Sequence, residues 1–254
     1  MAQKQTTKET KETSMTNQVH FILQGKGGVG KSLIAAFIAQ YFKDGGSSVY
    51  GIDTDPVNQT FTNYKALNAQ HIQIMEGSKI NERNFDKLME RLLLEDGIFV
   101  IDNGASSFVP LTNYLIENNA LEMLADAGRQ VFIHCVVTGG QALLDTLSGF
   151  VALAEQTPNK NIVVWINEYF GPIEMEGKHF TEMKAFHDHS GKVHGIVRIA
   201  KRTSDTYGKD MELLAANKMT FSEAIASPNF VLMAKSRFKT VQKDIYSQLN
   251  ESGF

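Results

Sequence analysis

Apolar runs of four to seven residues recur along the chain from Val19 onward. They lack the strict alternation of polar and apolar residues that marks a half-exposed strand, so each run predicts a strand buried on both faces. The predicted strands are residues 19–23, 48–52, 72–75, 98–101, 131–137, 162–166 and 193–199. Between two of these runs, Phe85, Leu88 and Leu92 share one face of a predicted helix.

Buried strands that alternate with helices predict a parallel sheet covered by helices on both faces. The expected fold class is therefore α/β, with a doubly wound, mostly parallel sheet of about seven or eight strands. In such folds ligands bind beyond the carboxyl ends of the strands. Residues that directly follow an apolar run are therefore the first candidates for a functional site.

The first 18 residues differ from the rest of the chain in composition. They are rich in Thr, Lys and Glu and hold no apolar residue between Ala2 and Met15. A segment that buries so little apolar surface cannot offset the entropy lost on ordering, so residues 1–18 are predicted to be a disordered tail. Residues 19–254 are predicted to form a single domain, since α/β folds of this length often remain undivided.

The composition predicts a cytoplasmic protein without a membrane anchor. No segment approaches the roughly 20 apolar residues that span a bilayer, and the N-terminus lacks the apolar centre of a secretory signal. The single cysteine, Cys135, lies within an apolar run and is predicted to be a buried strand residue. The 25 basic and 28 acidic side chains give a formal net charge of -3, so no overall basic field favours nucleic acid.

Two polar clusters are weaker candidates for function. A basic cluster near the C-terminus would contact DNA phosphates only as a local patch, and a solvated helix face is favoured because Asp244 and Glu251 dilute its charge. This cluster consists of Lys235, Arg237, Lys239 and Lys243. A histidine group lacks a thiol and an established metal spacing, so a solvated turn is predicted there. The histidines are His187, His189 and His194.

The strongest motif follows the first predicted strand. The stretch GKGGVGKS matches the phosphate-binding pattern G-x-x-x-x-G-K-[ST] and lies between a predicted strand and a predicted helix, as that pattern requires. Its glycines allow successive backbone N–H groups to surround phosphate oxygens at the start of the helix. Lys31 is expected to reach the β and γ phosphates, and Ser32 to ligate Mg²⁺. The predicted nucleotide-binding residues are Gly25, Lys26, Gly27, Gly28, Val29, Gly30, Lys31 and Ser32.

A second lysine, Lys26, occupies the first variable position of this loop. The spacing resembles the deviant phosphate-binding loop of the ParA/MinD group of P-loop ATPases. The resemblance implies that Lys26 reaches the phosphates of a nucleotide in the opposite subunit, so that ATP is sandwiched in a homodimer. Such a cation would stabilise charge in the transition state and make hydrolysis depend on dimerisation. Alternatively, Lys26 only adds positive charge to its own site.

Acidic residues follow two further predicted strands. The segment IDTDP resembles the D-x-D-P segment of the same group, which implies that Asp55 positions the attacking water. Asp53 is then expected to support the loop or the waters of the metal. Asp102, in IDNGASS, stands where a carboxylate would hold Mg²⁺ through water. A carboxylate in this position could instead cap a turn, but its place beside a phosphate-binding loop favours the metal role.

Two loops are further candidates, one for contacting the base and one for coupling the nucleotide state to the dimer surface. Asn167 follows the strand at 162–166, at a position from which the ParA/MinD group contacts adenine, and turn formation is the competing explanation. Residues 138–141 follow the strand at 131–137, and this loop would couple nucleotide state to the dimer surface.

A closer resemblance covers the chain from about Val19 to the C-terminal helix. Segments such as IDNGASSFVPL, VVTGGQALLDT and YFGPIEMEGK resemble the TraL family of plasmid conjugal transfer proteins. The resemblance implies an ATP- and Mg²⁺-dependent switch that is accessory to conjugation or plasmid maintenance, with conjugation or plasmid-stability proteins as partners. The alternative is a DNA-associated plasmid partition ATPase with weak non-specific DNA binding. A metabolic P-loop kinase is a third reading, which the deviant loop disfavours.

Overall fold

The computed structural model describes residues 17–254. The predicted disordered tail therefore lies outside the described residues, except for its last two positions. Of these, Gln18 already belongs to the first strand and is buried. The strand starts one residue earlier than predicted because Gln18 pairs with Gln130 of the neighbouring strand.

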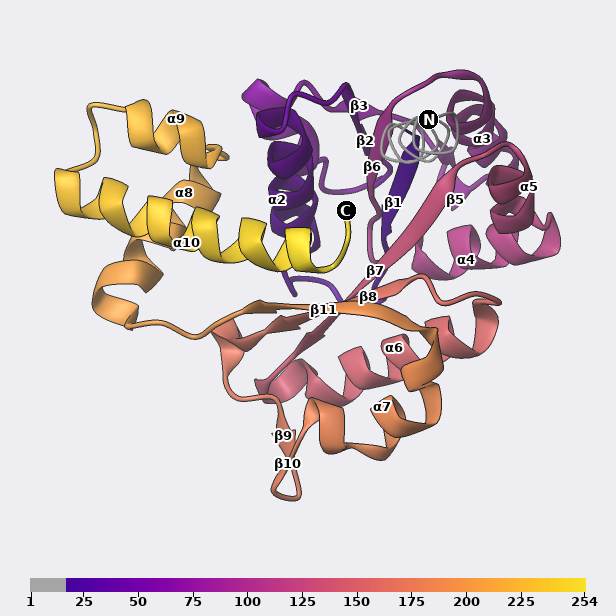
Figure 1. The fold of residues 1–254 in the computed structure, drawn as a ribbon. Coiled ribbons are helices and arrows are strands. Elements are labelled where there is room, and N and C mark those ends of the chain that lie inside the picture. Colours follow the sequence, from indigo (N-terminus) through magenta and orange to yellow (C-terminus); the bar gives the residue numbers. More distant parts are fainter. Residues whose placement is uncertain (1–16) are drawn as a thin grey trace, which may run out of the picture.

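A seven-stranded sheet forms the centre of the molecule (Figure 1). Its strands lie in the order β11-β8-β7-β1-β6-β2-β3, and every neighbouring pair is parallel. The strands are β1 (Gln18–Ile22), β2 (Val49–Asp53), β3 (Gln70–His71), β6 (Ile98–Asp102), β7 (Gln130–Thr138), β8 (Ile162–Asn167) and β11 (Val193–Ile199). The predicted doubly wound α/β fold is thus confirmed.

Helices cover both faces of this sheet. One face packs against α3 (Phe85–Leu94), α4 (Phe108–Glu117), α5 (Ala120–Asp126), α6 (Leu143–Gln156) and α7 (Lys184–His189). The other packs against α2 (Lys31–Asp44), α8 (Lys209–Ala216), α9 (Phe221–Ala226) and α10 (Leu232–Glu251). Figure 1 shows these two helical layers on opposite sides of the strands.

Burial on both faces explains why the strand sequences do not alternate. In β1, Phe21 packs into the core under α3 to α7, and its neighbour Ile22 packs into the core under α2 and α8 to α10. Both side chains are fully buried, so each position favours an apolar residue. Cys135 of β7 is also fully buried, as predicted, and burial raises the pKa of its thiol to about 12.

The predicted strand at 72–75 differs from the structure. In this part of the chain, only the two residues of β3, which precede the predicted strand, join the sheet, where they pair with β2. The chain then forms a small antiparallel hairpin of β4 (Met75–Glu76) and β5 (Lys79–Ile80). Gly77 makes this turn with a φ of 61°, a left-handed conformation that glycine adopts without strain. The apolar residue that suggested a strand, Ile74, is buried under the hairpin instead.

A second hairpin, β9 (Glu174–Met175) with β10 (Lys178–His179), projects beyond α6 and α7 (Figure 1). Among the described residues, no helix combines the length and apolar character needed to cross a lipid bilayer.

Candidate functional site

The phosphate-binding loop connects β1 to α2, as the motif predicted. Residues 25–28 are exposed, and α2 begins at Lys31, directly after the loop. Gly28 and Gly30 have φ angles of 76° and 101°, which a residue with a side chain rarely adopts. The loop therefore presents backbone N–H groups and the positive end of α2 to the same space.

A cavity of about 1030 Å³ opens beside this loop at the carboxyl edge of the sheet. Its walls include the loop itself and residues that follow three other strands, namely Asp55 after β2, Asn103 after β6 and Ala200 after β11. The sheet register explains the convergence, because Asp53 and Asp102 are paired neighbours at the ends of β2 and β6. Side chains that are distant in sequence thus meet in one site.

Lys31 lies in this cavity wall and is mostly buried. Its Nζ donates a hydrogen bond to the backbone oxygen of Lys26 at 3.0 Å, which holds the ammonium group inside the loop. Burial lowers the pKa of Lys31, while the nearby Asp102 and Asp55 carboxylates oppose that shift. An ammonium group so placed suits a phosphate oxygen, because phosphate supplies the charge that burial takes away.

Asp102 is also buried at this edge, with 2% of its surface exposed. Burial raises its pKa to about 7, whereas a hydrogen bond from Ser32 and the charge of Lys31 act in the opposite direction. Within the described part of the chain, its Oδ1 atom has no hydrogen-bond partner. A buried oxygen without a partner, next to a hydroxyl and the phosphate loop, fits a Mg²⁺ ion and its waters.

Asp53 is engaged differently. Its Oδ1 accepts a hydrogen bond from the backbone N–H of Asp55 at 3.0 Å, and its Oδ2 accepts from those of Phe61 and Thr62 at 2.9 and 3.2 Å. Burial raises its pKa, and these three hydrogen bonds counteract the rise. Of the two roles expected for Asp53, these contacts favour support of the loop.

Asp55 lines the cavity, with one carboxylate oxygen accepting the backbone N–H groups of Val57 and Asn58 at 2.9 and 3.0 Å. The chain after β6 passes very close to it. A Cβ atom on Gly104 would stand 2.7 Å from the carboxyl carbon of Asp55, so only glycine fits there. Gly104, in the segment IDNGASS, thus leaves the space that the Asp55 carboxylate occupies.

Lys26 points away from its own phosphate site. Its Nζ forms an ion pair with Asp145 Oδ2 at 2.8 Å, and both side chains are about half exposed. Asp145 lies in the first turn of α6, within the segment GGQALLDT. The two lysines of the loop therefore have separate environments, since Lys31 lies in the cavity wall and Lys26 is paired with α6.

Asn167 ends β8 and is buried. Its Nδ2 donates to the backbone oxygen of Val29 at 3.0 Å, and its Oδ1 accepts from the N–H of Tyr169 at 3.2 Å. The Asn167 side chain therefore holds the loop between β1 and α2 from the end of β8. It also caps the short turn that follows β8. It lines the cavity as well, so a contact with a base stays a prediction.

The loop at 138–141 packs closely against the start of the β9–β10 hairpin. A Cβ atom on Gly139 would lie 2.4 Å from the backbone oxygen of Pro172. Thr138 closes the other side, since its Oγ1 donates to the backbone oxygen of Asn167 at 2.8 Å. The loop is thus in contact with the end of β8 and with the segment that leads to the hairpin, and its coupling role stays a prediction.

Comparison with known proteins agrees with this geometry. A family model described as the CobQ/CobB/MinD/ParA nucleotide binding domain matches residues 20–215. Two Escherichia coli proteins named Protein TraL are similar over nearly their whole length. One is 49% identical over 236 residues, which is 92% of this chain and 98% of the relative. The other is 50% identical over 234 residues, covering 92% and 97%.

The chain belongs to the TraL family of MinD/ParA-like nucleotide-binding domains. Solved structures agree on the fold. The MinD cell division protein of Aquifex aeolicus matches with a TM-score of 0.52 and 15% identity, over 89% of this chain and 95% of that one. The MinD cell division ATPase of Pyrococcus furiosus matches with a TM-score of 0.52 and 14% identity, over 91% and 99%.

The histidine-rich segment of this TraL-family chain is not the single turn that was predicted. His187 and His189 lie in α7, and His194 belongs to β11, where its Nε2 hydrogen-bonds with the backbone oxygen of Ser252 at 2.8 Å. The described residues contain no group of three or more His, Cys, Asp or Glu side chains arranged for a metal ion.

Sequence reasoning missed the part of the TraL-family cavity wall beyond β11. Arg202, Tyr207 and Asp244 all line the cavity. Arg202 follows the apolar run at 193–199, so the rule that ligands bind beyond strand ends could have found it. Asp244 lies inside the long helix α10 and had no such signal, because nothing local places a helix interior at a ligand site.

Proposed function

We propose that the chain is an ATP- and Mg²⁺-dependent nucleotide switch that acts as a homodimer and assists plasmid conjugation or plasmid maintenance. The observation that carries the proposal is the different placement of the two loop lysines. Lys31 is buried in the cavity wall, whereas Lys26 is half exposed and pairs with Asp145 of α6. A half-exposed lysine can reach a second subunit that a buried lysine cannot. The TraL resemblance supports the plasmid context.

Each residue then has a defined task. Lys31 neutralises the β and γ phosphates, and Asp55 orients the attacking water from the cavity wall. Ser32 and Asp102 are the residues that would hold Mg²⁺, which when bound neutralises phosphate charge. Lys26 leaves Asp145 and enters the partner's site, where it stabilises negative charge in the transition state. Hydrolysis thereby depends on dimerisation.

Lys26→Ala tests this division of labour. We expect the variant to bind ATP with an affinity within about twofold of the wild type, yet to lose ATP-dependent dimerisation and to hydrolyse ATP at least about tenfold more slowly. Calorimetry, light scattering and phosphate release measure the three quantities. Lys31→Ala is the matched control from the same loop and should lose ATP binding itself.

Asp145→Asn separates the roles further, because it releases Lys26 without removing it. It should retain both dimerisation and turnover. A Lys26→Ala protein that dimerises and turns over like the wild type would refute the trans role, and equal loss of binding in both lysine variants would favour the alternative in which Lys26 serves its own site.

One observation favours the alternative of a DNA-associated partition ATPase. Lys235, Lys239 and Lys243 recur every four residues on α10, and no ion pair is found for them among residues 17–254. Asp244, which was expected to dilute this charge, is instead paired with Arg202. The row therefore retains a net positive charge that could contact phosphates.

A gel shift with non-specific duplex DNA at low salt distinguishes the two functions. A partition protein should bind the duplex in the presence of ATP, and Lys239→Glu combined with Lys243→Glu should weaken this binding by about tenfold or more. Absence of binding at low salt, in a protein shown to bind ATP, would leave the conjugation switch as the better account.

A further inference from the structure

The cavity has two chemically different halves. One half contains the phosphate loop with Lys31 and Ser32. The other lies beyond β11 and has an apolar wall that includes Leu33 of α2, Met211 of α8 and Ile245 of α10. A nucleotide shows the same division, with a charged triphosphate at one end and a flat, largely apolar base at the other.

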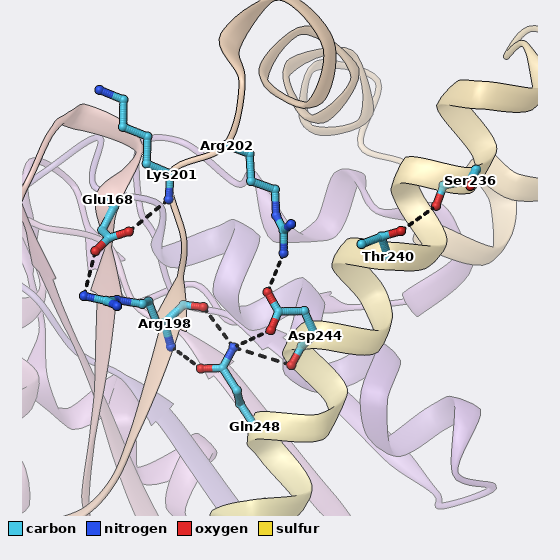
Figure 2. Close-up of polar contacts among 8 residues, drawn as sticks. All are labelled: Glu168, Arg198, Lys201, Arg202, Ser236, Thr240, Asp244 and Gln248. Atoms are coloured by element: carbon cyan, nitrogen blue, oxygen red, sulfur yellow. Dashed lines mark hydrogen bonds and ion pairs between the residues drawn. The ribbon is translucent and has the colours of Figure 1, made fainter.

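Arg202 is the cation of this second half. Its guanidinium carbon lies 5.2 Å from the centre of the Tyr207 ring, and its Nη2 donates to Asp244 Oδ2 at 2.6 Å. All three side chains line the cavity, and Figure 2 shows Arg202 reaching from its loop toward Asp244 on α10. The guanidinium plane is thus held between an aromatic ring and a carboxylate, and it still has 28% of its surface exposed.

The loop that carries Arg202 is fixed at several points. Glu168 accepts the backbone N–H of Lys201 at 3.0 Å and pairs with Arg198 at 2.9 Å. Gln248 of α10 bonds both the backbone N–H and the backbone oxygen of Arg198 (Figure 2). These contacts join the end of β8, the end of β11 and α10 around one wall of the cavity. Arg202 therefore starts from a preorganised position.

Besides Arg202, the polar side chains that line the cavity around this half include Lys201, Ser204 and Glu212, and none of them presents a flat cationic surface. Asn167, the residue expected to contact the base, already uses its side-chain amide in hydrogen bonds to the backbone of Val29 and Tyr169. A guanidinium plane next to an aromatic ring, by contrast, is a surface on which a base stacks through its π face. Such stacking suits any purine and does not by itself separate adenine from guanine.

We propose that Arg202 is the base-contacting residue of this site, with the purine of a nucleoside triphosphate stacked against Arg202 and Tyr207. Asp244 is its positioning residue, which holds the guanidinium from α10. The inference rests on the proposed nucleotide-binding function and goes beyond it. It also makes α10 part of the base site, so that an occupied base half restrains this C-terminal helix while an occupied phosphate half alone does not.

Calorimetry with two probes tests the assignment. ATP fills both halves of the cavity, and inorganic tripolyphosphate fills only the phosphate half. Arg202→Ala should weaken ATP binding by about tenfold or more and change tripolyphosphate binding by less than about twofold. Arg202→Lys keeps the charge and loses the plane, so it should recover little of the ATP affinity. Asp244→Asn should lose about threefold for ATP only.

Arg237→Ala is the matched control. The Arg237 side chain extends from α10 and forms an ion pair with Asp210 of α8, but neither residue lines the cavity. The Arg237→Ala variant should therefore bind both probes as tightly as the wild type does. Hydrogen exchange supplies a second readout, since ATP but not tripolyphosphate should slow exchange of the α10 amides near Asp244 in the wild type, and Arg202→Ala should abolish the difference.

The outcomes separate the two proposals. A wild type that binds neither probe would refute the nucleotide function itself. A wild type that binds both, with Arg202→Ala and Arg202→Lys either unchanged or weakened equally for ATP and tripolyphosphate, would overturn the base assignment and leave the nucleotide function intact. Should Arg202→Ala fail to fold, the Lys and Asp244→Asn variants decide the question by the same ratio of the two affinities.

Discussion

Two groups of buried ionisable side chains, one at the carboxyl edge of the sheet and one in its interior, differ in kind. Asp102 and Lys31 are at the carboxyl edge, whereas His20 of β1 and His134 of β7 are neighbours in the sheet interior. Both pairs are strongly desolvated, and burial is the largest cause of every pKa shift among them. What separates them is whether their polar atoms have partners.

The histidine pair is fully satisfied as neutral rings. The indole N–H of Trp165 donates to His134 Nδ1 at 2.9 Å, so the proton of His134 is on Nε2 and is donated to His20 Nδ1 at 2.9 Å. The remaining N–H of His20 is then donated to Gln18 Oε1 at 3.0 Å. Every ring nitrogen of the two histidines thus has a hydrogen-bond partner while both rings are uncharged, and this network stabilises the sheet.

The carboxyl edge is built in the opposite way. Among the described residues Asp102 Oδ1 accepts nothing, although it is buried. Such a group costs stability unless a ligand supplies the missing interaction. The comparison teaches that burial and a shifted pKa do not by themselves mark a functional site in this protein. An unpaired polar atom beside a cavity is the better indicator.

Acid should produce the largest effect, and it acts on the histidine pair. Burial lowers the pKa of His20 from 6.5 to about 3, and the pKa of His134 lies well below the ordinary value. Both rings therefore stay neutral in the folded protein while they bind protons in the unfolded chain. Their stabilising contribution is complete above about pH 6.5 and decreases as the pH falls toward 3.

Near pH 5 this loss amounts to about 2 kcal/mol for each histidine, or about 4 kcal/mol for the pair. Urea unfolding at about pH 7.5 and pH 5 measures it in the Asp102→Asn background, because the Asp102 carboxyl, with a pKa of about 7 in the folded protein, binds a proton over the same range and would stabilise the wild type in acid. His187→Gln, which changes an exposed histidine of α7, is the control and should show the same pH dependence as the wild type. Equal stability at the two pH values would contradict the assignment of a neutral, buried pair.

A smaller effect is expected from Asp102→Asn, and it tests the other group. The change neutralises a buried carboxylate whose Oδ1 atom has no hydrogen-bond partner among the described residues, so the melting temperature of the nucleotide-free protein should stay equal or rise. Binding of ATP in the presence of Mg²⁺ should weaken by about tenfold, because one of the two residues that would hold the ion is altered. Thermal unfolding and calorimetry measure the two results.

Asp53→Asn is the matched control for this variant. It should lower the melting temperature, because Asp53 accepts three backbone N–H groups and an amide nitrogen in its place would face donors, at a cost of about 1–3 kcal/mol. If Asp102→Asn destabilised the protein and Asp53→Asn did not, Asp102 would be the structural carboxylate, and the proposed contrast between the two residues would be wrong.

Six of the seven predicted strands match the structure to within a residue at each end, because each is a short apolar run whose side chains are mostly buried against the helices on the two faces of the sheet. The run at 72–75 failed because only Ile74 in it is fully buried, and the chain turns there into the β4–β5 hairpin instead of pairing in the sheet. The turn predicted for the histidine segment was wrong because His187 and His189 lie in the short helix α7, whereas His194 lies in the strand that the run at 193–199 had already predicted.

The sequence by itself determined the phosphate loop, its place after β1 and the carboxylates at the strand ends, because each depends on residues that are adjacent in the chain. The tertiary structure alone decided the contacts of Lys26 with Asp145, of Asn167 with Val29 and of Arg202 with Asp244. The two partners in each contact are far apart in sequence. Parallel strands and the helices between them bring such residues to one edge only when the whole sheet is assembled.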